Sequence, residues 1–334
     1  MNKFTFAAIF FIVTFNTIGF CTTEIIVEDE YLYEIHTTNI DMPASIALDS
    51  NENLYVGNDG TTNQIYKVSS INHEVNYFGP TLHDPDSVTI DSQYNIYIGN
   101  DGQGLQIVKQ DNTSSQFTSS YMYNITALIV DKLGIFEKSG FIYVANSIAS
   151  TSNHIVRVSP NGESEVFLKN SPILHAAHGL AFDNTSYLYA ASSGSHKVFR
   201  ISSDASIETF IELSSPESIA FNQTDGNLYV GDIVDNKVYK VNLSGNVTVF
   251  AENIKPYGIA IDNSGNLFIT DRIVSPHRII KIFKKSTPCE GLYTQEQVYE
   301  MISKILTWGD INKDNKIGLE EAIRALIIAS GANK

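Results

Sequence analysis

A run near the C-terminus carries oxygen-bearing side chains at the spacing of a calcium-binding loop. Asp310, Asn312 and Asp314 stand at loop positions one, three and five, and Glu321 closes the loop at position twelve. Lys316, at position seven, offers its backbone carbonyl. Calcium takes roughly six to eight oxygen ligands, and a loop of this length supplies them from these positions. The pattern predicts calcium as a cofactor; the alternative is a polar turn between two helices.

Two amphipathic segments flank this loop. Thr294 and Gln297 fit a helix-capping box, and apolar residues recur at helical spacing after them and again over about residues 319–329. We therefore predict a small helix–loop–helix over 294–334, joined to the body by a linker over 286–293. Two short helices bury little apolar surface alone, so their apolar faces must meet the body of the chain, a second copy or a partner.

Polar side chains also recur at two equivalent places along the body of the chain. The first set is Ala44, Asp86, Thr126, His178, Glu217 and Tyr257, and the second is Asn58, Asn100, Asn146, Ser192, Asp232 and Asp271. Converging oxygens of this kind suit Ca²⁺ or Mg²⁺. The candidate ligand-binding residues are Asp86, His178, Glu217, Tyr257, Asp232 and Asp271, with His178 as candidate catalytic base. The alternatives are a solvent-filled mouth for the first set and loop hydrogen bonding for the second.

The elements that must position these residues form one unit repeated six times. Each unit has an apolar segment closed by Asp or Asn, at positions 49, 91, 131, 183, 222 and 262, and then an aromatic strand and an apolar-x-basic strand. Four short strands in about 40 residues indicate a propeller blade. The sequence predicts an all-β six-bladed β-propeller over 24–285 with a small C-terminal α-helical helix–loop–helix. The sixth unit lacks a fourth strand, and Tyr31–Ile35 is expected to supply it.

In a ring of this kind the innermost strand begins at the top face, so both polar sets should face the mouth of the central channel. Lys255–Asp271 resembles the blade motif of NHL-repeat propellers, and the likeness covers about residues 30–285. Gluconolactonase-like propellers share this architecture. That resemblance implies a metal held by a Glu, an Asn and an Asp, for which Glu217, Asn146 and Asp232 are the right residue types. The first blade has Ala44 where that family tends to place its Glu.

The two ends of the chain suggest where the protein acts and how it is attached. The tail resembles a single EF-hand, or half of a dockerin, which implies attachment or assembly. At the other end, Lys3 and an apolar run over 4–15 fit a signal peptide over 1–21, which predicts a secreted, extracytoplasmic protein. A lipid anchor on Cys21 is the alternative. No later run is long and apolar enough to span a membrane.

Composition excludes several classes of protein. Apolar residues make up 43% of the 334 residues, which excludes a disordered chain. Lys and Arg total 22 against 37 Asp and Glu, a formal charge of −15 that disfavours nucleic-acid binding.

Two functions fit these observations. The first is an exported binding module that meets a protein or carbohydrate partner through the top face or the tail, its oligomeric state open. The alternative is a metal-dependent hydrolase of lactonase type, in which Asp86, Glu217 and Asp232 hold the metal and His178 is the base.

Overall fold

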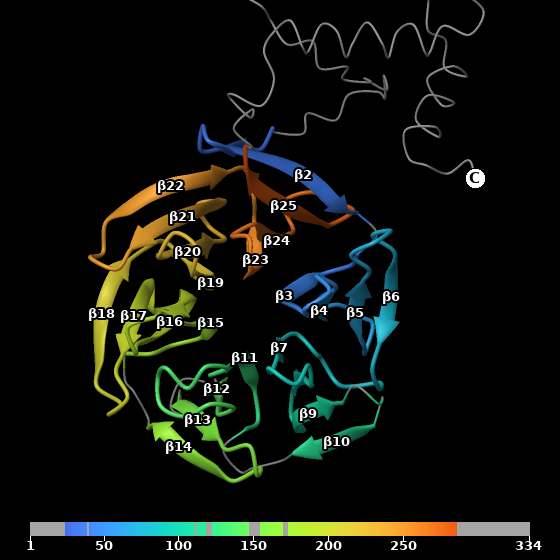
Figure 1. Ribbon diagram of the computed structural model, residues 1–334, viewed down its shortest axis with the longest axis vertical. Coiled ribbons are helices and arrows are strands. Elements are labelled where there is room, and N and C mark those ends of the chain that lie inside the picture. The colour runs from blue at the N-terminus through green and yellow to red at the C-terminus, as the bar shows by residue number, and fades with distance from the viewer. Residues whose placement is uncertain are drawn as a thin grey trace, which may run out of the picture. The chain divides into compact units, whose positions relative to one another are not determined.

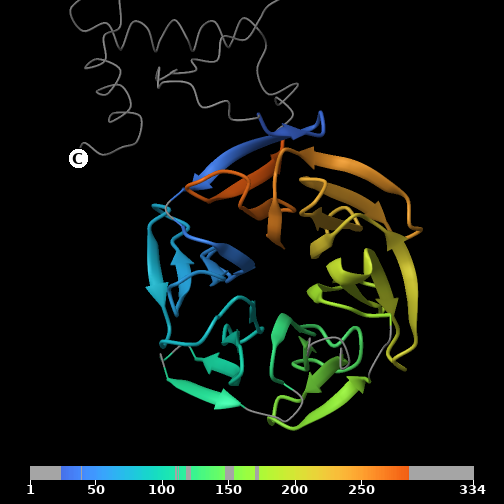
Figure 2. The same cartoon turned by 180° about the vertical axis from the view of Figure 1, so that it is seen from behind.

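Six antiparallel sheets stand around a central channel in the computed structural model (Figures 1 and 2). The structure describes residues 24–285 except 39, 110, 112, 118–121, 147–153 and 170–172. The predicted signal peptide (1–21), linker (286–293) and calcium-binding tail (294–334) lie outside the described residues. The prediction of a six-bladed β-propeller is confirmed.

Each blade runs from an inner to an outer strand in chain order. The strands are β3 (Pro43–Leu48), β4 (Leu54–Asn58), β5 (Ile65–Val68) and β6 (Val75–Phe78) in blade one; β7 (Val88–Ile90), β8 (Ile96–Asn100), β9 (Gly104–Val108) and β10 (Ser114–Phe117) in blade two; β11 (Ile125–Val130), β12 (Ile142–Asn146), β13 (His154–Val158) and β14 (Ser164–Leu168) in blade three; β15 (Ala177–Phe182), β16 (Leu188–Ser192), β17 (Lys197–Ile201) and β18 (Ile207–Glu212) in blade four; β19 (Pro216–Asn222), β20 (Asn227–Asp232), β21 (Lys237–Asn242) and β22 (Val247–Glu252) in blade five; and β23 (Pro256–Ile261), β24 (Leu267–Asp271) and β25 (Arg278–Lys284) in blade six. A short 3₁₀ helix, η1 (Ser193–Ser195), follows β16.

The N-terminal segment closes the ring. Strand β2 (Tyr31–Thr37) pairs antiparallel with β25, Tyr31 opposite Lys284, which confirms the expected fourth strand of blade six. Strand β1 (Ile26–Val27) was not expected from the sequence, and it pairs with β22 as a fifth strand of blade five. Blades five and six are therefore completed by N-terminal strands that lie far away in the chain from the strands they pair with.

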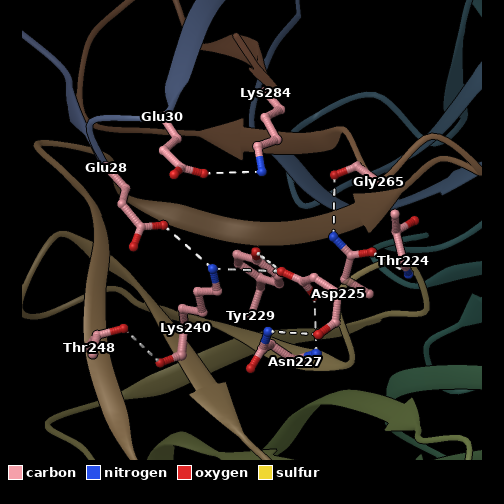
Figure 3. A network of polar contacts seen from close by, with 11 residues as sticks. Glu28, Glu30, Thr224, Asp225, Asn227, Tyr229, Lys240, Thr248, Gly265 and Lys284 are labelled. Carbon is pink, nitrogen blue, oxygen red and sulfur yellow. Dashed lines mark hydrogen bonds and ion pairs between the residues drawn. The ribbon is translucent and has the colours of Figure 1, made fainter. Parts of the chain in front are cut away.

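Ion pairs hold this closure from outside (Figure 3). Lys284 Nζ lies 3.0 Å from Glu30 Oε2, and Lys240 Nζ lies 3.5 Å from Glu28 Oε2. Lys240 also lies 3.7 Å from Asp225 Oδ2, which accepts a 2.7 Å hydrogen bond from the Tyr229 hydroxyl. The segment around β1 and β2 is thereby tied to blades five and six.

The hydrophobic core is divided among the six interfaces between neighbouring blades. Each interface holds one cluster of buried side chains, and the aromatic residue of the second strand packs into it. Tyr143, Tyr189, Tyr229 and Phe268 expose 1% of their surface or less. Tyr97 is only partly buried. Aromatic side chains bury large areas, so this column accounts for much of the adhesion between blades.

The repeated Asp or Asn that closes each inner strand forms a turn at the far end of the channel. In blade two, Asp91 Oδ1 accepts hydrogen bonds from the amides of Gln93 and Asn95, both at 2.8 Å. A turn in which a short side chain accepts a hydrogen bond from the amide two residues ahead is an Asx-turn.

No helix within the described ranges is long and apolar enough to cross a membrane.

Candidate functional site

β-Bulges position the first polar set at the channel mouth. In four blades the ladder between the first and second strands shifts register, and the skipped residues are Thr126, His178, Glu217 and Tyr257. In blade one the shift skips Ala44 and Ser45, and Asp86 stands two residues before β7. A bulge re-aims the extra side chain out of the regular alternation of the strand. We call these six equivalent positions, five of which lie at register shifts, the inner ring: Ala44, Asp86, Thr126, His178, Glu217 and Tyr257.

His178 and Glu217 contact each other between blades four and five. The His178 Nδ1 lies 2.5 Å from Glu217 Oε1, and the Ser193 hydroxyl lies 3.4 Å from the same nitrogen. The Glu217 side chain is 11% exposed and that of His178 is 32% exposed. Because Nδ1 is engaged by the carboxylate, Nε2 is the ring nitrogen that a ligand in the mouth would meet. A carboxylate in this place orients the imidazole ring.

Tyr257 is covered by a guanidinium group. The Arg272 Cζ lies 3.9 Å from the centre of the Tyr257 ring, a cation–π contact. Arg272 is held there by the backbone oxygens of Pro43 and Met42 and by Asp59, whose Oδ2 lies 2.7 Å from Nη1. His178 and Tyr257 also line a cavity of about 60 Å³ in the channel.

Asp86 lies in an acidic environment on the inner ring. Its backbone oxygen accepts hydrogen bonds from the Ser45 amide at 3.1 Å and the Ser45 hydroxyl at 2.8 Å. A Cβ on Gly57 would lie 2.1 Å from that oxygen, so only glycine allows this approach. Burial, then the charges of Asp101, Asp84 and Asp59, raises the pKa of Asp86 well above its ordinary value.

Asp101 belongs to the same acidic group. Burial, followed by the charge of Asp84, raises the pKa of Asp101 to about 6, although the Ile125 amide donates a 3.1 Å hydrogen bond to its Oδ1. Burial and the charge of Asp59 also raise the pKa of Asp84. We call Asp59, Asp84, Asp86 and Asp101 the acidic cluster.

The second polar set differs from the expectation that both sets face the mouth. Its members expose 2% of their surface or less: Asn58, Asn100, Asn146, Ser192, Asp232 and Asp271. Their side chains hold the loops at the top of the blades. Asp232 accepts hydrogen bonds from the amides of Ser215, Val234 and Asp235 at 2.7, 3.0 and 2.9 Å.

Asp271 is used in the same way. It accepts hydrogen bonds from the amides of Lys255 and Ile273 and pairs with Arg278, whose Nε lies 2.8 Å from Oδ2. Binding of a ligand by Asp232 and Asp271 stays a prediction that these contacts do not favour, because the carboxylate oxygens are already occupied.

The propeller residues that the sequence suggested as metal ligands are not brought together in the described part of the chain. Within the described part of the chain, no group of three or more His, Cys, Asp or Glu side chains is placed to hold a metal ion. Asn146, the amide of the gluconolactonase-like set, accepts hydrogen bonds from the Tyr123 and Asn124 amides. The calcium ligands Asp310, Asn312, Asp314, Lys316 and Glu321 lie outside the described residues.

The opposite end of the channel has its own cavity, of about 300 Å³. Inner-strand side chains such as Leu128, Phe182 and Phe221 form apolar walls, and Asp131 and Lys132 lie among the lining residues. The polar inner-ring residues do not line it. The two cavities nevertheless share walls formed by inner-strand residues: Ile46, Val88, Leu128, Leu180, Ile219 and Ile259.

Sequence reasoning missed the acidic cluster around Asp86. A signal was present: Asn58-Asp59-Gly60 and Asn100-Asp101-Gly102 repeat the same tripeptide after the second strands of blades one and two. These are neighbouring blades, so the second residue of each tripeptide falls on the same sector of the top face. Arg272 was also missed, because its partners come from the other end of the chain.

The architecture defines the structural class of this chain, which is a six-bladed β-propeller with a polar channel mouth. A gluconolactonase from Xanthomonas campestris is similar to it with a TM-score of 0.65 and 13% identity, covering 78% of this chain and 91% of that chain. A catalytically inactive histidine-to-alanine variant of virginiamycin B lyase from Staphylococcus aureus, solved with quinupristin, has a TM-score of 0.56 and 15% identity, covering 77% and 100%.

A chain of a nidogen/laminin complex is also similar, with a TM-score of 0.56 and 16% identity over 65% of this chain and 84% of that chain. At these identities the similarity shows the fold alone, and the fold serves enzymes and binding proteins alike. No protein-family model matches the chain, and no curated protein matches its sequence.

Proposed function

We propose that this protein binds a small polar molecule at the top mouth of its propeller channel. The observation that carries the proposal is the inner ring, where β-bulges turn polar side chains of neighbouring blades toward one mouth. The side chains of His178, Glu217 and Tyr257 are partly exposed there, whereas those of the second polar set are buried in hydrogen bonds to their own loops. Ligand sites combine a concave, pre-formed surface with a few polar groups in this manner.

The proposal is tested by measuring thermal stabilisation of the full chain by a panel of sugar lactones, amines and carboxylic acids. A molecule that binds the folded state raises the melting temperature with its concentration. His178→Gln and Glu217→Gln should each reduce that rise. Glu163→Gln removes a charge from an exposed turn of blade three and is the matched control. A stabilising molecule whose effect survives both ring variants binds elsewhere and contradicts the proposal.

A second candidate function is catalysis, and the His178–Glu217 pair favours it. An imidazole held by a carboxylate is a general base, and such groups contribute about 10²–10⁴-fold to a rate. The fold neighbours include a gluconolactonase and a lyase whose histidine-to-alanine variant is inactive. We propose lactone opening as the first reaction to test, with His178 accepting the proton of the attacking water.

Catalysis is measured as hydrolysis of gluconolactone above the spontaneous rate, with and without EDTA. His178→Gln should remove the excess rate, while Glu163→Gln should keep it. Loss with EDTA would identify the metal-dependent form of this activity. An excess rate that persists in His178→Gln would exclude His178 as the base.

We further propose that the chain is exported and that its tail binds calcium and serves attachment to a protein or carbohydrate partner. Glu321 closes the predicted loop with two oxygens, whereas Glu320 is not a loop ligand. Calorimetry on the full chain should show about tenfold or greater weakening of calcium binding for Glu321→Gln, because a charged ligand is lost. Glu320→Gln is the matched control. Equal affinities in the two variants would reject this loop.

A further inference from the structure

One carboxylate oxygen of the inner ring is buried without a partner. Asp86 as a residue is partly exposed, but its Oδ1 exposes less than 1 Å² and makes no hydrogen bond to any described residue. An unpaired buried carboxylate is costly, and most buried polar atoms of proteins have a partner. The Asp86 oxygen is therefore in an arrangement that a bound group would complete.

The surroundings of Asp86 specify the sign of that group. The charges that act on it come from Asp101, Asp84 and Asp59, on the loops of blades one and two. Two basic side chains lie near this sector. His83 acts on Asp84 and Asp101, and Arg272 is committed to Asp59 and to the backbone oxygens of Met42 and Pro43. Net negative charge thus surrounds an acceptor that has no partner among the described residues, which favours a cation.

The geometry disfavours a metal ion as that cation. Divalent ions in proteins require several converging oxygens, roughly six to eight for calcium. No three acidic or imidazole side chains converge in this way among the described residues. An ammonium group is a compact charge whose three N–H donors are satisfied by single, separate acceptors.

We propose that the channel mouth binds a ligand that carries an ammonium group, and that Asp86 accepts its hydrogen bond while Asp101 and Asp84 supply charge. This inference rests on the proposed small-molecule site and names the class of its ligand. Asp86 of blade two occupies a position of the inner ring equivalent to those of His178 in blade four and Glu217 in blade five.

Protonation supports this assignment. Because the pKa values of Asp86 and Asp101 are raised, these carboxyl groups hold protons that a bound cation would displace. An amine stays protonated well above neutral pH, since alkyl ammonium groups resemble Lys with a pKa of about 10. Affinity should therefore increase as the pH rises through about 6, where Asp101 loses its proton. Binding below that pH should release protons into the buffer.

The experiment titrates the full chain with benzylammonium chloride, in EDTA, and follows binding by calorimetry. Benzyl alcohol has the same ring without the charge, and should bind at least about tenfold more weakly because a charge-assisted hydrogen bond is lost. Asp86→Asn should weaken benzylammonium binding by about the same factor. Glu34→Gln removes an exposed charge from β2, outside the mouth, and should leave affinity unchanged.

Failure of the inference is distinguishable from failure of the proposed site. Absence of benzylammonium binding, or equal affinity for benzyl alcohol, overturns the ammonium assignment. So does full affinity in Asp86→Asn. If Asp86→Asn binds normally but His178→Gln loses another molecule of the panel, the small-molecule site stands and its ligand is not an amine.

Discussion

The inner ring and the second polar set use their carboxylates for different purposes. Each set contains two carboxylates, Asp86 and Glu217 in the inner ring and Asp232 and Asp271 in the second set. Asp232 and Asp271 expose none of their surface, and their oxygens accept hydrogen bonds from loop amides. Asp86, by contrast, has an oxygen without a described partner.

The difference lies in whether the hydrogen-bonding capacity of a side chain is already used. A regular strand end presents its side chain to the adjoining loop, whose amides need acceptors. A bulge turns its side chain away from that loop. In blades four and five the bulged residues His178 and Glu217 keep part of their side chains exposed, whereas the strand ends Ser192 and Asp232 are buried in contacts with their own loops.

The largest effect that separates the two sets is the loss of a brace. Asp232→Ala leaves three amides at the top of blade five without their acceptor, and each unsatisfied buried group costs about 1–3 kcal/mol. We expect the free energy of unfolding to fall by about 3 kcal/mol or more in chemical denaturation.

The matched control is Asp204→Ala, which removes an acceptor of the Ser206 amide in an exposed turn. That variant should cost less than about 1 kcal/mol, because water replaces the lost acceptor. Similar losses in the two variants would mean that the second set is not a structural brace.

A smaller effect, of opposite sign, is expected in the acidic cluster. Asp101→Asn keeps an acceptor for the Ile125 amide and removes a charge that burial and Asp84 disfavour. The folded state holds a proton on Asp101 up to about pH 6, whereas the unfolded chain releases it near the ordinary value. Wild-type stability attributable to this group is therefore greatest at low pH and falls as the pH rises to about 6.

The measurement is the melting temperature of both proteins across this interval. Asp101→Asn should melt above wild type at about pH 7.5, and the difference should vanish near pH 4, where both side chains are neutral. A difference that is constant with pH would show that the charge of Asp101 is not the cause.

The sequence predicted the fold well because the fold is repetitive. Six copies of one pattern defined the blades, and the missing strand of the last copy identified Tyr31–Ile35 as the closing strand, which β2 confirms. The positions of the inner ring also followed from the repeat. Their bulges did not, because a register shift depends on pairing between strands and leaves no mark on apolar periodicity.

The partners of the inner ring were less predictable for a related reason. The contact between Arg272 and Asp59 joins the last blade to the first, across 213 positions of the chain. The acidic cluster collects residues from three loops. These contacts form only when the blades assemble into the ring. The sequence pattern of a single blade therefore contains one partner of each contact but not the contact itself.

The smallest effect on stability is expected where the proposed function is concentrated. His178→Gln keeps a side-chain amide that donates to Glu217, and the His178 side chain is 32% exposed, so its replacement opens little buried space. We expect the free energy of unfolding to change by less than about 1 kcal/mol. Ligand binding should nevertheless be weakened, and any lactone opening should be lost, since the amide of Gln is not a base at neutral pH. Denaturation and ligand titration of the same preparation check both halves. A large loss of stability together with unchanged binding would reverse the comparison and make His178 a brace like Asp232.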